Sequence, residues 1–494
     1  MKLCCVLILL LLVPPSWAWA ADYTVCAAAC DYTTIQDCDD AASRGDSCTV
    51  SAGTYAERVT VTTAASGTDT ITFTAVGTVN MKGFLLQADY IVVDGFTILN
   101  DADVTQLANG APAFRLGSGV FIEGDYCTVQ NNTISYCPTM GICGYRATYD
   151  ANPQYATIKN NTISYCGFNG ITVQGTGHLI EGNDISHSVM SPLGATSDPA
   201  VRCTAEDVPY PCCTGDGAGT CSDDNDADGM RIFGDGHTIR DNYIHDLYLT
   251  DENWEDPPYV NTDAHIDIAQ TWRGFTNILF ERNIFKMDEE SQGIYIAEQA
   301  AYPGTVHDVE IRYNVIIMSS NDGYGPAISI LRDGTEDADP ERVEDFTISN
   351  NTFVNVGGEQ SQYGIRAREV NGITIKNNIF YNFGGTDYSY IRWGTQVAND
   401  VQDYNLIYTT GDAINGGSVE ANDVWMEDPK FSNLSAENFH LQSTSPAINA
   451  GTDLSLTTDC DGNSVPVGSA PDIGAYEYNP TNMSGSTIIG GSED

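Results

Sequence analysis

Acidic, basic and aromatic side chains that could act together on a substrate gather between residues 228 and 298. Asp228, Asp267 and Glu298 are candidate members of a carboxyl pair, in which one group acts as the acid and the other as base or nucleophile. Such pairs hydrolyse glycosidic bonds when the two carboxyl groups lie roughly 5–9.5 Å apart. The sequence therefore offers the groups that glycoside hydrolysis needs.

The same region offers a second chemistry, β-elimination on a polymer of uronic acid. This reaction needs a base for the proton next to the sugar carboxylate and a cation that neutralises that carboxylate. His265, Tyr295 or an arginine could be the base, and Arg231 or a calcium ion could neutralise the carboxylate. The catalytic candidates are therefore Asp228, Arg231, His265, Asp267 and Glu298, and the substrate-binding candidates are Gln270, Arg273, Tyr295 and Arg366.

A purely structural explanation of these residues also stands, because His, Asp and Arg side chains on one exposed sheet can form a solvated ladder of ion pairs. The acidic run of residues 223–228 has two explanations as well. Asp223, Asp224 and Asp226 form either a solvated loop or a set of oxygen ligands for calcium, without the glycine and terminal glutamate of an EF-hand. Calcium is the one cofactor that the sequence suggests.

A repeat along the chain must position these side chains. An apolar-alternating strand, an asparagine and a second short strand recur, as in Thr374–Phe380. Asn132 and Asn161 are 29 residues apart, and Asn351 and Asn378 are 27 residues apart. A period in the twenties that is built of period-2 strands predicts a β-solenoid.

Each coil of the solenoid is predicted to hold three strands, with the repeated asparagine at a corner. We expect this asparagine to adopt the left-handed αL conformation and to hydrogen-bond its equivalents one coil above and one coil below. The predicted fold class is therefore all-β, a parallel β-helix of three-strand coils with an asparagine ladder at one corner.

The first strand of each coil places an apolar residue inward and the next residue outward. Coils repeat at about 4.8 Å, so side chains on neighbouring coils become neighbours in space. Two long loops, residues 188–228 and 247–264, lead into the strands that carry Arg231 and His265, and loops of this length are commonly functional. Stacking in register predicts an exposed column of Thr172, Arg231, Asp267, Tyr295, Ser329, Arg366 and Arg392.

Cysteines are predicted to brace the solenoid. The sequence contains 15 Cys, and Cys137 and Cys166 each follow a repeat asparagine by five residues. These two should therefore stack on adjacent coils, either as a disulfide or as a reduced pair in the core. The remaining clusters, at positions 26, 30, 38 and 48 and at positions 203, 212, 213 and 221, are predicted to staple the N-terminal end and to brace one loop.

Both ends of the repeat region look capped. Residues 31–46 predict a short amphipathic helix that precedes the segment at 50–55, and the closing segments are residues 438–441, 445–451 and 472–478. Together with the asparagine repeats, these segments resemble the pectate-lyase-like superfamily. The resemblance implies a right-handed parallel β-helix with a short N-terminal capping helix. It also implies that substrate lies along the outward face of the first strands, between the loops at their two ends.

The chain is divided by composition into three parts. Residues 1–20 combine a positive start, a short apolar run and a small-residue cleavage site, which is typical of a secretory signal peptide. We expect residues 21–478 to form one β-helix domain and residues 479–494 to form a flexible tail. The protein is therefore predicted to be secreted or displayed at the cell surface, to lack a membrane span and to be monomeric.

Charge restricts the partners of this chain. The 67 Asp and Glu residues outnumber the 21 Lys and Arg residues, which gives a formal net charge of −46. Such a surface repels nucleic acid and anionic membranes, and it opposes acidic polysaccharides unless bound cations or a local basic patch intervene. The resemblance to the pectate-lyase-like superfamily implies an extracellular polysaccharide as the partner. The predicted function is that of a polysaccharide lyase or a glycoside hydrolase. The alternative is a non-catalytic surface or adhesion solenoid that binds glycans.

Overall fold

The structure is a computed structural model that describes most of the chain between residues 20 and 480. The candidates Asp223, Asp224, Asp226, His265 and Arg273 lie outside the described residues, as do most of the two long loops and the cysteines at 203, 212, 213 and 221. The described residues are 20–100, 113–145, 152–166, 169–188, 228–247, 266–271, 274–288, 292–299, 304–319, 325–333, 343–357, 363–383, 390–409 and 419–480.

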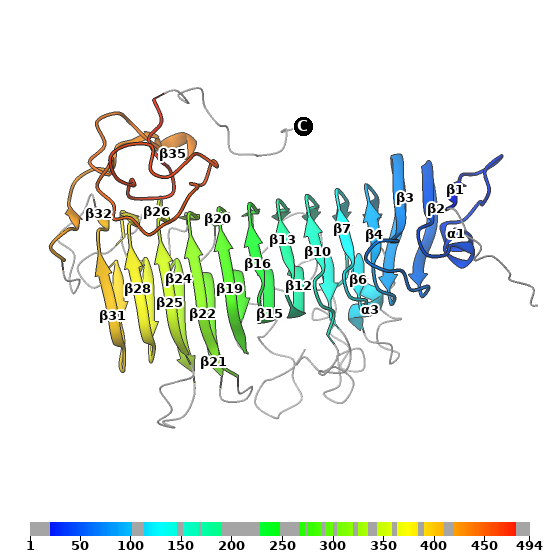
Figure 1. Cartoon of the computed structure of the whole chain (residues 1–494), viewed down its shortest axis with the longest axis horizontal. Coiled ribbons are helices and arrows are strands. Elements are labelled where there is room, and N and C mark those ends of the chain that lie inside the picture. Colours follow the sequence, from blue (N-terminus) through cyan, green and yellow to red (C-terminus); the bar gives the residue numbers. More distant parts are fainter. Residues whose placement is uncertain are drawn as a thin grey trace, which may run out of the picture.

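The strands stack into one long parallel β-helix, with its N-terminal coil at one end (Figure 1). Each coil passes through three strands, which stack on their equivalents in the coils before and after. In one coil, β12 (Asn169–Thr176) lies in what we call the first sheet, β13 (Leu179–Glu181) in the second sheet and β14 (Asp184–Ser186) in the third sheet. The all-β, three-strand solenoid that the repeat predicts is confirmed.

Two long strands and a short one begin the stack, and successive coils then supply one strand to each sheet. The opening strands are β1 (Asp22–Val25), β2 (Ser47–Val61) and β3 (Ile71–Leu86). The first sheet continues with β6 (Val120–Ile122), β9 (Ile142–Gly144), β12, β15 (Asp228–Asp235), β18 (Asp267–Thr271), β21 (Gln292–Gln299), β24 (Ile328–Asp333), β27 (Ile365–Arg368) and β30 (Ile391–Trp393). The second sheet continues with β4 (Ile91–Asp94), β7 (Thr128–Gln130), β10 (Thr157–Lys159), β13, β16 (Thr238–Arg240), β19 (Phe275–Glu281), β22 (Val306–Arg312), β25 (Val343–Ser349), β28 (Asn371–Lys376) and β31 (Ala398–Asp403). The third sheet continues with β5 (Thr97–Leu99), β8 (Thr133–Ser135), β11 (Thr162–Ser164), β14, β17 (Tyr243–His245), β20 (Ile284–Met287), β23 (Val315–Met318), β26 (Thr352–Asn355), β29 (Ile379–Tyr381), β32 (Leu406–Tyr408) and β33 (Val424–Trp425).

A buried asparagine ladder fixes the corner between the second and third sheets. In each step, one Oδ1 accepts hydrogen bonds from the backbone N–H and the side-chain Nδ2 of the asparagine one coil earlier, at 2.8–3.1 Å. The ladder satisfies buried polar groups that would otherwise be costly in an apolar core. Its members are Asn132, Asn161, Asn183, Asn242, Asn283, Asn314, Asn351, Asn378 and Asn405.

The predicted position of the αL residue is wrong by one residue. The ladder asparagines do not have positive φ; the residue immediately before each of them does. Asn131, for example, has φ of 56° and Tyr313 has φ of 53°. The preceding residue turns the corner, and this turn frees the ladder side chain to point into the core.

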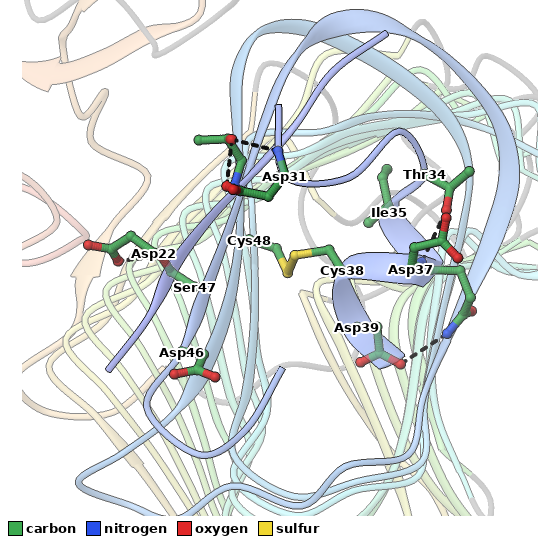
Figure 2. The surroundings of a disulfide bond; sticks show 12 residues. Asp22, Asp31, Thr34, Ile35, Asp37, Cys38, Asp39, Asp46, Ser47 and Cys48 are labelled. Atoms are coloured by element: carbon green, nitrogen blue, oxygen red, sulfur yellow. Dashed lines mark hydrogen bonds between the residues drawn. A yellow bond between two sulfur atoms is a disulfide. The ribbon is translucent and has the colours of Figure 1, made fainter. Parts of the chain in front are cut away.

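A disulfide-stapled cap closes the N-terminal end (Figure 2). The predicted helix is α1 (Ile35–Ala41), which buries Ile35 and Cys38 and begins with Thr34 accepting a hydrogen bond from the backbone N–H of Asp37. Disulfides link Cys38 to Cys48 on β2 and Cys26 to Cys30. The predicted N-terminal staple is therefore confirmed.

The C-terminal segment packs beside the stack and does not cap its end, contrary to the sequence prediction. Residues 426–480 contain β34 (Phe431–Asn433), the 3-10 helix η3 (Leu434–Ala436) and β35 (Asn438–Leu441). Phe431 and Phe439 share an apolar cluster with Ile317 and Ile379 on the outward face of the third sheet. The segment lies against the last coils, over β20 to β32 (Figure 1). We call it the C-terminal module.

Cys137 and Cys166 are buried, free thiols at equivalent positions of adjacent coils. Of the two alternatives that the sequence allows, the structure has the reduced pair, so the predicted disulfide is absent. Burial, followed by the neighbouring Cys166 thiol, raises the pKa of Cys137 well above its usual value. None of the helices in the described residues has the length and apolar character that crossing a bilayer requires.

Candidate functional site

The outward column of the first sheet differs from the predicted one at a single strand. Arg231 is the partner of Gln270, and Gln270 is the partner of Tyr295, so the predicted member Asp267 does not belong to the column. The column is not uniformly exposed, because Gln270 is 7% and Ser329 is 0% exposed whereas Arg392 is open to solvent. Its members are Thr172, Arg231, Gln270, Tyr295, Ser329, Arg366 and Arg392.

The different register of β18 follows from which residues fill the core. Ala269 and not Ile266 is the partner of Met230. The alternation of apolar residues predicts a register in which Ile266 is the partner of Met230, three residues before the observed partner Ala269. Both isoleucines are buried, but a small residue takes the inward position opposite Met230. The periodicity of apolar residues in the sequence does not reveal that a small residue takes this inward position.

Three of the predicted catalytic residues form a cluster at the beginning of β15 and β18. The Nε atom of Arg231 donates to Oδ2 of Asp228 at 2.6 Å, and the backbone N–H of Asp267 donates to Oδ1 of Asp228 at 2.9 Å. Asp228 and Asp267 are each 0% exposed, and the side chain of Arg231 is 12% exposed. We call Asp228, Arg231 and Asp267 the acidic cluster. It places two carboxyl groups on adjacent coils beside one guanidinium.

The acidic cluster belongs to a second polar column, which the sequence did not reveal. Asn169 is the partner of Asp228, and Asp267 is the partner of Gln292. Asn169 donates to the hydroxyl of Thr172 three residues later at 3.0 Å, which repeats the spacing of the Asp228–Arg231 pair one coil earlier. The two charged coils are therefore flanked by coils whose equivalent side chains are neutral amides. The recurrence of a polar residue three positions before the column was the available signal.

Glu298 does not join the acidic cluster. It lies six residues beyond Gln292 on β21, which corresponds to about 20 Å along the strand. Glu298 forms an ion pair with Arg332, whose Nε atom is 3.6 Å from the Glu298 carboxylate. The distance of about 20 Å between Glu298 and the level of the acidic cluster exceeds the ~5–9.5 Å that separates the two groups of a catalytic carboxyl pair. The structure therefore leaves Asp228 and Asp267 as the pair that adjacent coils bring together.

His245 and Asp246 form a second group of charged side chains, which lies on another side of the β-helix. His245 belongs to β17 in the third sheet, where its ring nitrogens bond to Asp184 at 2.9 Å and Asp246 at 2.6 Å. Burial lowers the pKa of His245, but the two carboxylates outweigh burial and raise this pKa to about 9. The imidazole is therefore protonated at neutral pH and cannot act there as a base.

The far end of the outward column is basic. Arg366 and Arg392 are partners on β27 and β30, and they line a pocket of about 270 Å³ together with Arg368, Gly394 and Thr395. Burial, followed by the charges of Arg392 and Arg368, lowers the pKa of Arg366. Within the described residues, no group of three or more His, Cys, Asp or Glu side chains is placed to hold a metal ion.

Comparisons with known proteins identify the fold. A sequence profile described as "Right handed beta helix region" matches residues 118–335, and one described as "Periplasmic copper-binding protein (NosD)" matches residues 32–198. No curated protein matches the chain.

Solved structures resemble the chain over most of its length. XylC in complex with xylose is 12% identical with a TM-score of 0.53, and the match covers 92% of this chain and 98% of XylC. Pectate lyase Pel9A is 13% identical, with a TM-score of 0.43 and coverage of 90% and 91%. PfbA, a surface adhesin of Streptococcus pneumoniae, is 15% identical, with a TM-score of 0.39 and coverage of 77% and 88%. The profile, the coordinates and the XylC structure agree that this chain has the right-handed parallel β-helix fold.

Proposed function

We propose that the chain is an extracellular carbohydrate-active β-helix protein that cleaves a polysaccharide at the acidic cluster. The observation that carries the proposal is the contact of Asp228 with Arg231 and with the backbone of Asp267 on the next coil. Two buried carboxyl groups beside a guanidinium are costly unless the arrangement serves a purpose, and perturbed charged groups concentrate at functional sites. The two N-terminal disulfides support an oxidising, extracellular location.

The shape of the face supports a polymeric substrate. The outward column repeats at about 4.8 Å over seven coils, so it offers a straight row of side chains longer than a single small ligand. Gln270 and Tyr295 follow Arg231 in this row, and their amide and hydroxyl groups suit the hydroxyl groups of a sugar chain. A polysaccharide lying across the coils would contact the column, and Arg231 belongs both to the column and to the acidic cluster.

Hydrolysis is the reaction that the geometry supports best. Asp228 and Asp267 lie on adjacent coils, and the coil spacing of about 4.8 Å is near the ~5–5.5 Å carboxyl separation of retaining glycosidases. Both oxygens of Asp228 already accept hydrogen bonds, so Asp228 suits the nucleophile and Asp267 the acid and base. The reaction requires that substrate binding expose these two buried carboxyl groups. In the first step Asp228 would then attack the anomeric carbon while Asp267 gives its proton to the leaving oxygen. In the second step Asp267 would take a proton from water, which displaces Asp228 and releases the sugar.

β-Elimination is the second candidate reaction. Arg231 and Tyr295 favour it, because they lie in the same outward column, two coils apart. The Tyr295 oxygen would take the proton next to a uronate carboxylate that Arg231 neutralises. The electron pair would form a double bond in the sugar ring as the bond to the leaving oxygen breaks.

The test is turnover on a panel of neutral and acidic polysaccharides, followed by reducing-end release and by the absorbance of unsaturated uronate. Hydrolysis predicts reducing ends without this absorbance, and a loss of about 100-fold or more in Asp228→Asn and in Asp267→Asn. Elimination predicts the absorbance, and a loss of similar size in Tyr295→Phe. Asp241→Asn is the matched control. Asp241 lies away from the first sheet, where its carboxylate is 2.8 Å from Nε of Arg282. Binding without turnover on any member would support the adhesion alternative and contradict the enzyme.

A further inference from the structure

Two arginines at the C-terminal end of the outward column have no acidic partner among the residues that the structure describes. Arg366 on β27 and Arg392 on β30 are partners in register, and neither forms an ion pair in the described part of the chain. This is unexpected in a protein with 67 acidic and only 21 basic side chains, where most arginines could find a carboxylate. Placing two like charges on adjacent coils costs free energy unless an anion compensates them.

The surroundings hold these arginines in place without neutralising them. The Nη1 atom of Arg392 donates to the Tyr363 hydroxyl at 2.8 Å, and its guanidinium carbon lies 4.9 Å from the centre of the Tyr363 ring. Arg368 lies on the same outward face two residues beyond Arg366, and its Nη2 atom donates to the backbone oxygen of Arg332 at 2.8 Å. Arg368 also forms an ion pair with Glu369, at 3.9 Å. These contacts position Arg392 and Arg368, and the positive charges of Arg366 and Arg392 are available to a ligand.

A buried hydroxyl next to these arginines is also unsatisfied. Ser329 on β24 is the partner of Arg366, is 0% exposed, and its Oγ has no hydrogen-bond partner among the described residues. A buried hydroxyl without a partner costs about 1–3 kcal/mol, so such groups are rare unless something completes them. Ser329 points outward from the first sheet, as Arg366 does, and it lies one coil before Arg366, beside the pocket and not in its lining.

We propose that Arg366, Arg368 and Arg392, which line what we call the arginine pocket, bind the carboxylate or sulfate of an acidic sugar unit, and that the adjacent Ser329 hydroxyl completes its hydrogen bonding to this ligand. Among the described residues, those that line this pocket of about 270 Å³ include no acidic side chain. Guanidinium groups bind planar oxyanions in a bidentate manner, and the serine hydroxyl adds a third donor.

This inference rests on the proposed function and specifies its substrate class as an anionic glycan. Arg366 is four coils from Arg231, which is about 19 Å along the helix axis. A single sugar chain lying along the column would therefore reach the acidic cluster and the arginine pocket together. The local positive charge would offset the repulsion that the net charge of −46 exerts on an acidic polymer.

The test measures binding of three hexasaccharides by calorimetry: a uronic acid hexamer, the same hexamer with its carboxylates reduced to alcohols, and a sulfated neutral hexamer. We expect the full chain to bind an acidic hexamer about tenfold or more tightly than the reduced one. The double variant Arg366→Gln/Arg392→Gln should lose this preference and keep its affinity for the reduced hexamer. Arg240→Gln, which removes an arginine paired with Glu181 on the second sheet, should bind as the unchanged protein does.

The outcomes separate the two proposals. Preference for the uronate or for the sulfated hexamer supports the arginine pocket and identifies the source of the anion. Equal affinity for acidic and reduced hexamers, or an unchanged preference in a folded double variant, overturns the arginine pocket while polysaccharide binding stands. Failure to bind any hexamer, with no turnover on the polysaccharide panel, overturns the proposed function together with this inference.

Discussion

The Nδ2 atom of Asn283 donates to Oδ1 of Asn314 at 2.8 Å, although the two residues are 31 positions apart in the chain. Asn314 repeats the contact with Asn351 at 3.0 Å, and its Nδ2 also donates to the backbone oxygen of Phe280 at 3.0 Å. Each ladder asparagine thus joins three coils, which makes the corner a continuous hydrogen-bonded line through the core. Replacing one member leaves several buried groups without partners.

Asn314→Ala should lower the free energy of unfolding by about 3–5 kcal/mol. The change removes the oxygen that accepts from both the backbone N–H and Nδ2 of Asn283, and it removes the Nδ2 donor of the Phe280 carbonyl oxygen. Oδ1 of Asn351 keeps the backbone N–H of residue 314, and each buried group that loses its partner costs about 1–3 kcal/mol. Urea unfolding followed by circular dichroism measures the effect. The exposed Asn422→Ala is the control and should change stability by less than about 1 kcal/mol. A similar loss in both variants would contradict a special role for the ladder.

Acid should destabilise the protein through His178 and His237, which are stacked with their ring centres 4.8 Å apart in the core. Burial lowers the pKa of His178 to about 3 and of His237 to about 4. The unfolded chain takes up these protons below pH ~6.5 while the folded chain does not, so stability is full above this pH and falls as the pH drops. The expected loss at pH 5 is about 2 kcal/mol for each histidine.

The measurement is urea unfolding at pH 7.5 and pH 5 for the unchanged protein and for His237→Gln. The variant should lose stability at pH 7.5, because the backbone N–H of His178 donates to Nδ1 of His237. Its further loss between pH 7.5 and pH 5 should be smaller than that of the unchanged protein. An identical pH dependence in both would show that His237 is protonated in the folded state.

Asp39→Asn should stabilise the N-terminal cap at neutral and alkaline pH. Burial, followed by the charge of Asp40, raises the pKa of Asp39 to about 6, and Oδ1 of Asp39 accepts no hydrogen bond in the described residues (Figure 2). The folded chain holds this proton more tightly than the unfolded chain, so stability falls as pH rises from ~4 to ~6 and stays low above that.

Thermal unfolding at pH 4 and pH 8 tests this prediction. The expected gain for Asp39→Asn is about 1–3 kcal/mol at pH 8 and close to zero at pH 4. Asp37→Asn, an exposed position in the same helix, should show no comparable gain. A gain of equal size at both pH values would mean that packing and not charge is responsible.

Phe431→Ala should loosen the C-terminal module. Phe431 is 6% exposed, and its ring packs against Tyr381 at 5.5 Å and against Phe439 at 5.3 Å between ring centres. Removing a buried phenyl ring costs about 3–5 kcal/mol. Hydrogen exchange of the third-sheet strand β29 (Ile379–Tyr381) should quicken, because the module covers its outward face. Val419→Ala, at an exposed position before the module, is the control and should leave this exchange unchanged.

The sequence by itself determined the fold class and its corner. The asparagine and the alternating strand recur within each coil, so short-range periodicity is enough to predict a solenoid with Asn314 above Asn283. The N-terminal helix and the cysteines Cys38 and Cys48 could also be predicted, because capping and disulfide signals are local. The sequence predicts the αL conformation at the ladder asparagine itself, one position after the residue that adopts it, because asparagine tolerates this conformation at many positions.

Only the tertiary structure decided which side chains meet. Gln270 replaces Asp267 in the column because the register of β18 depends on how Ala269 fits the core opposite Met230, and strands that long loops separate do not encode their register locally. The distance of Glu298 from the acidic cluster follows from that register. The docking of Phe431 and Phe439 on the third sheet is likewise a contact between surfaces distant in sequence. A local pattern predicts what each coil contains, whereas the alignment of coils is settled by packing across the whole stack.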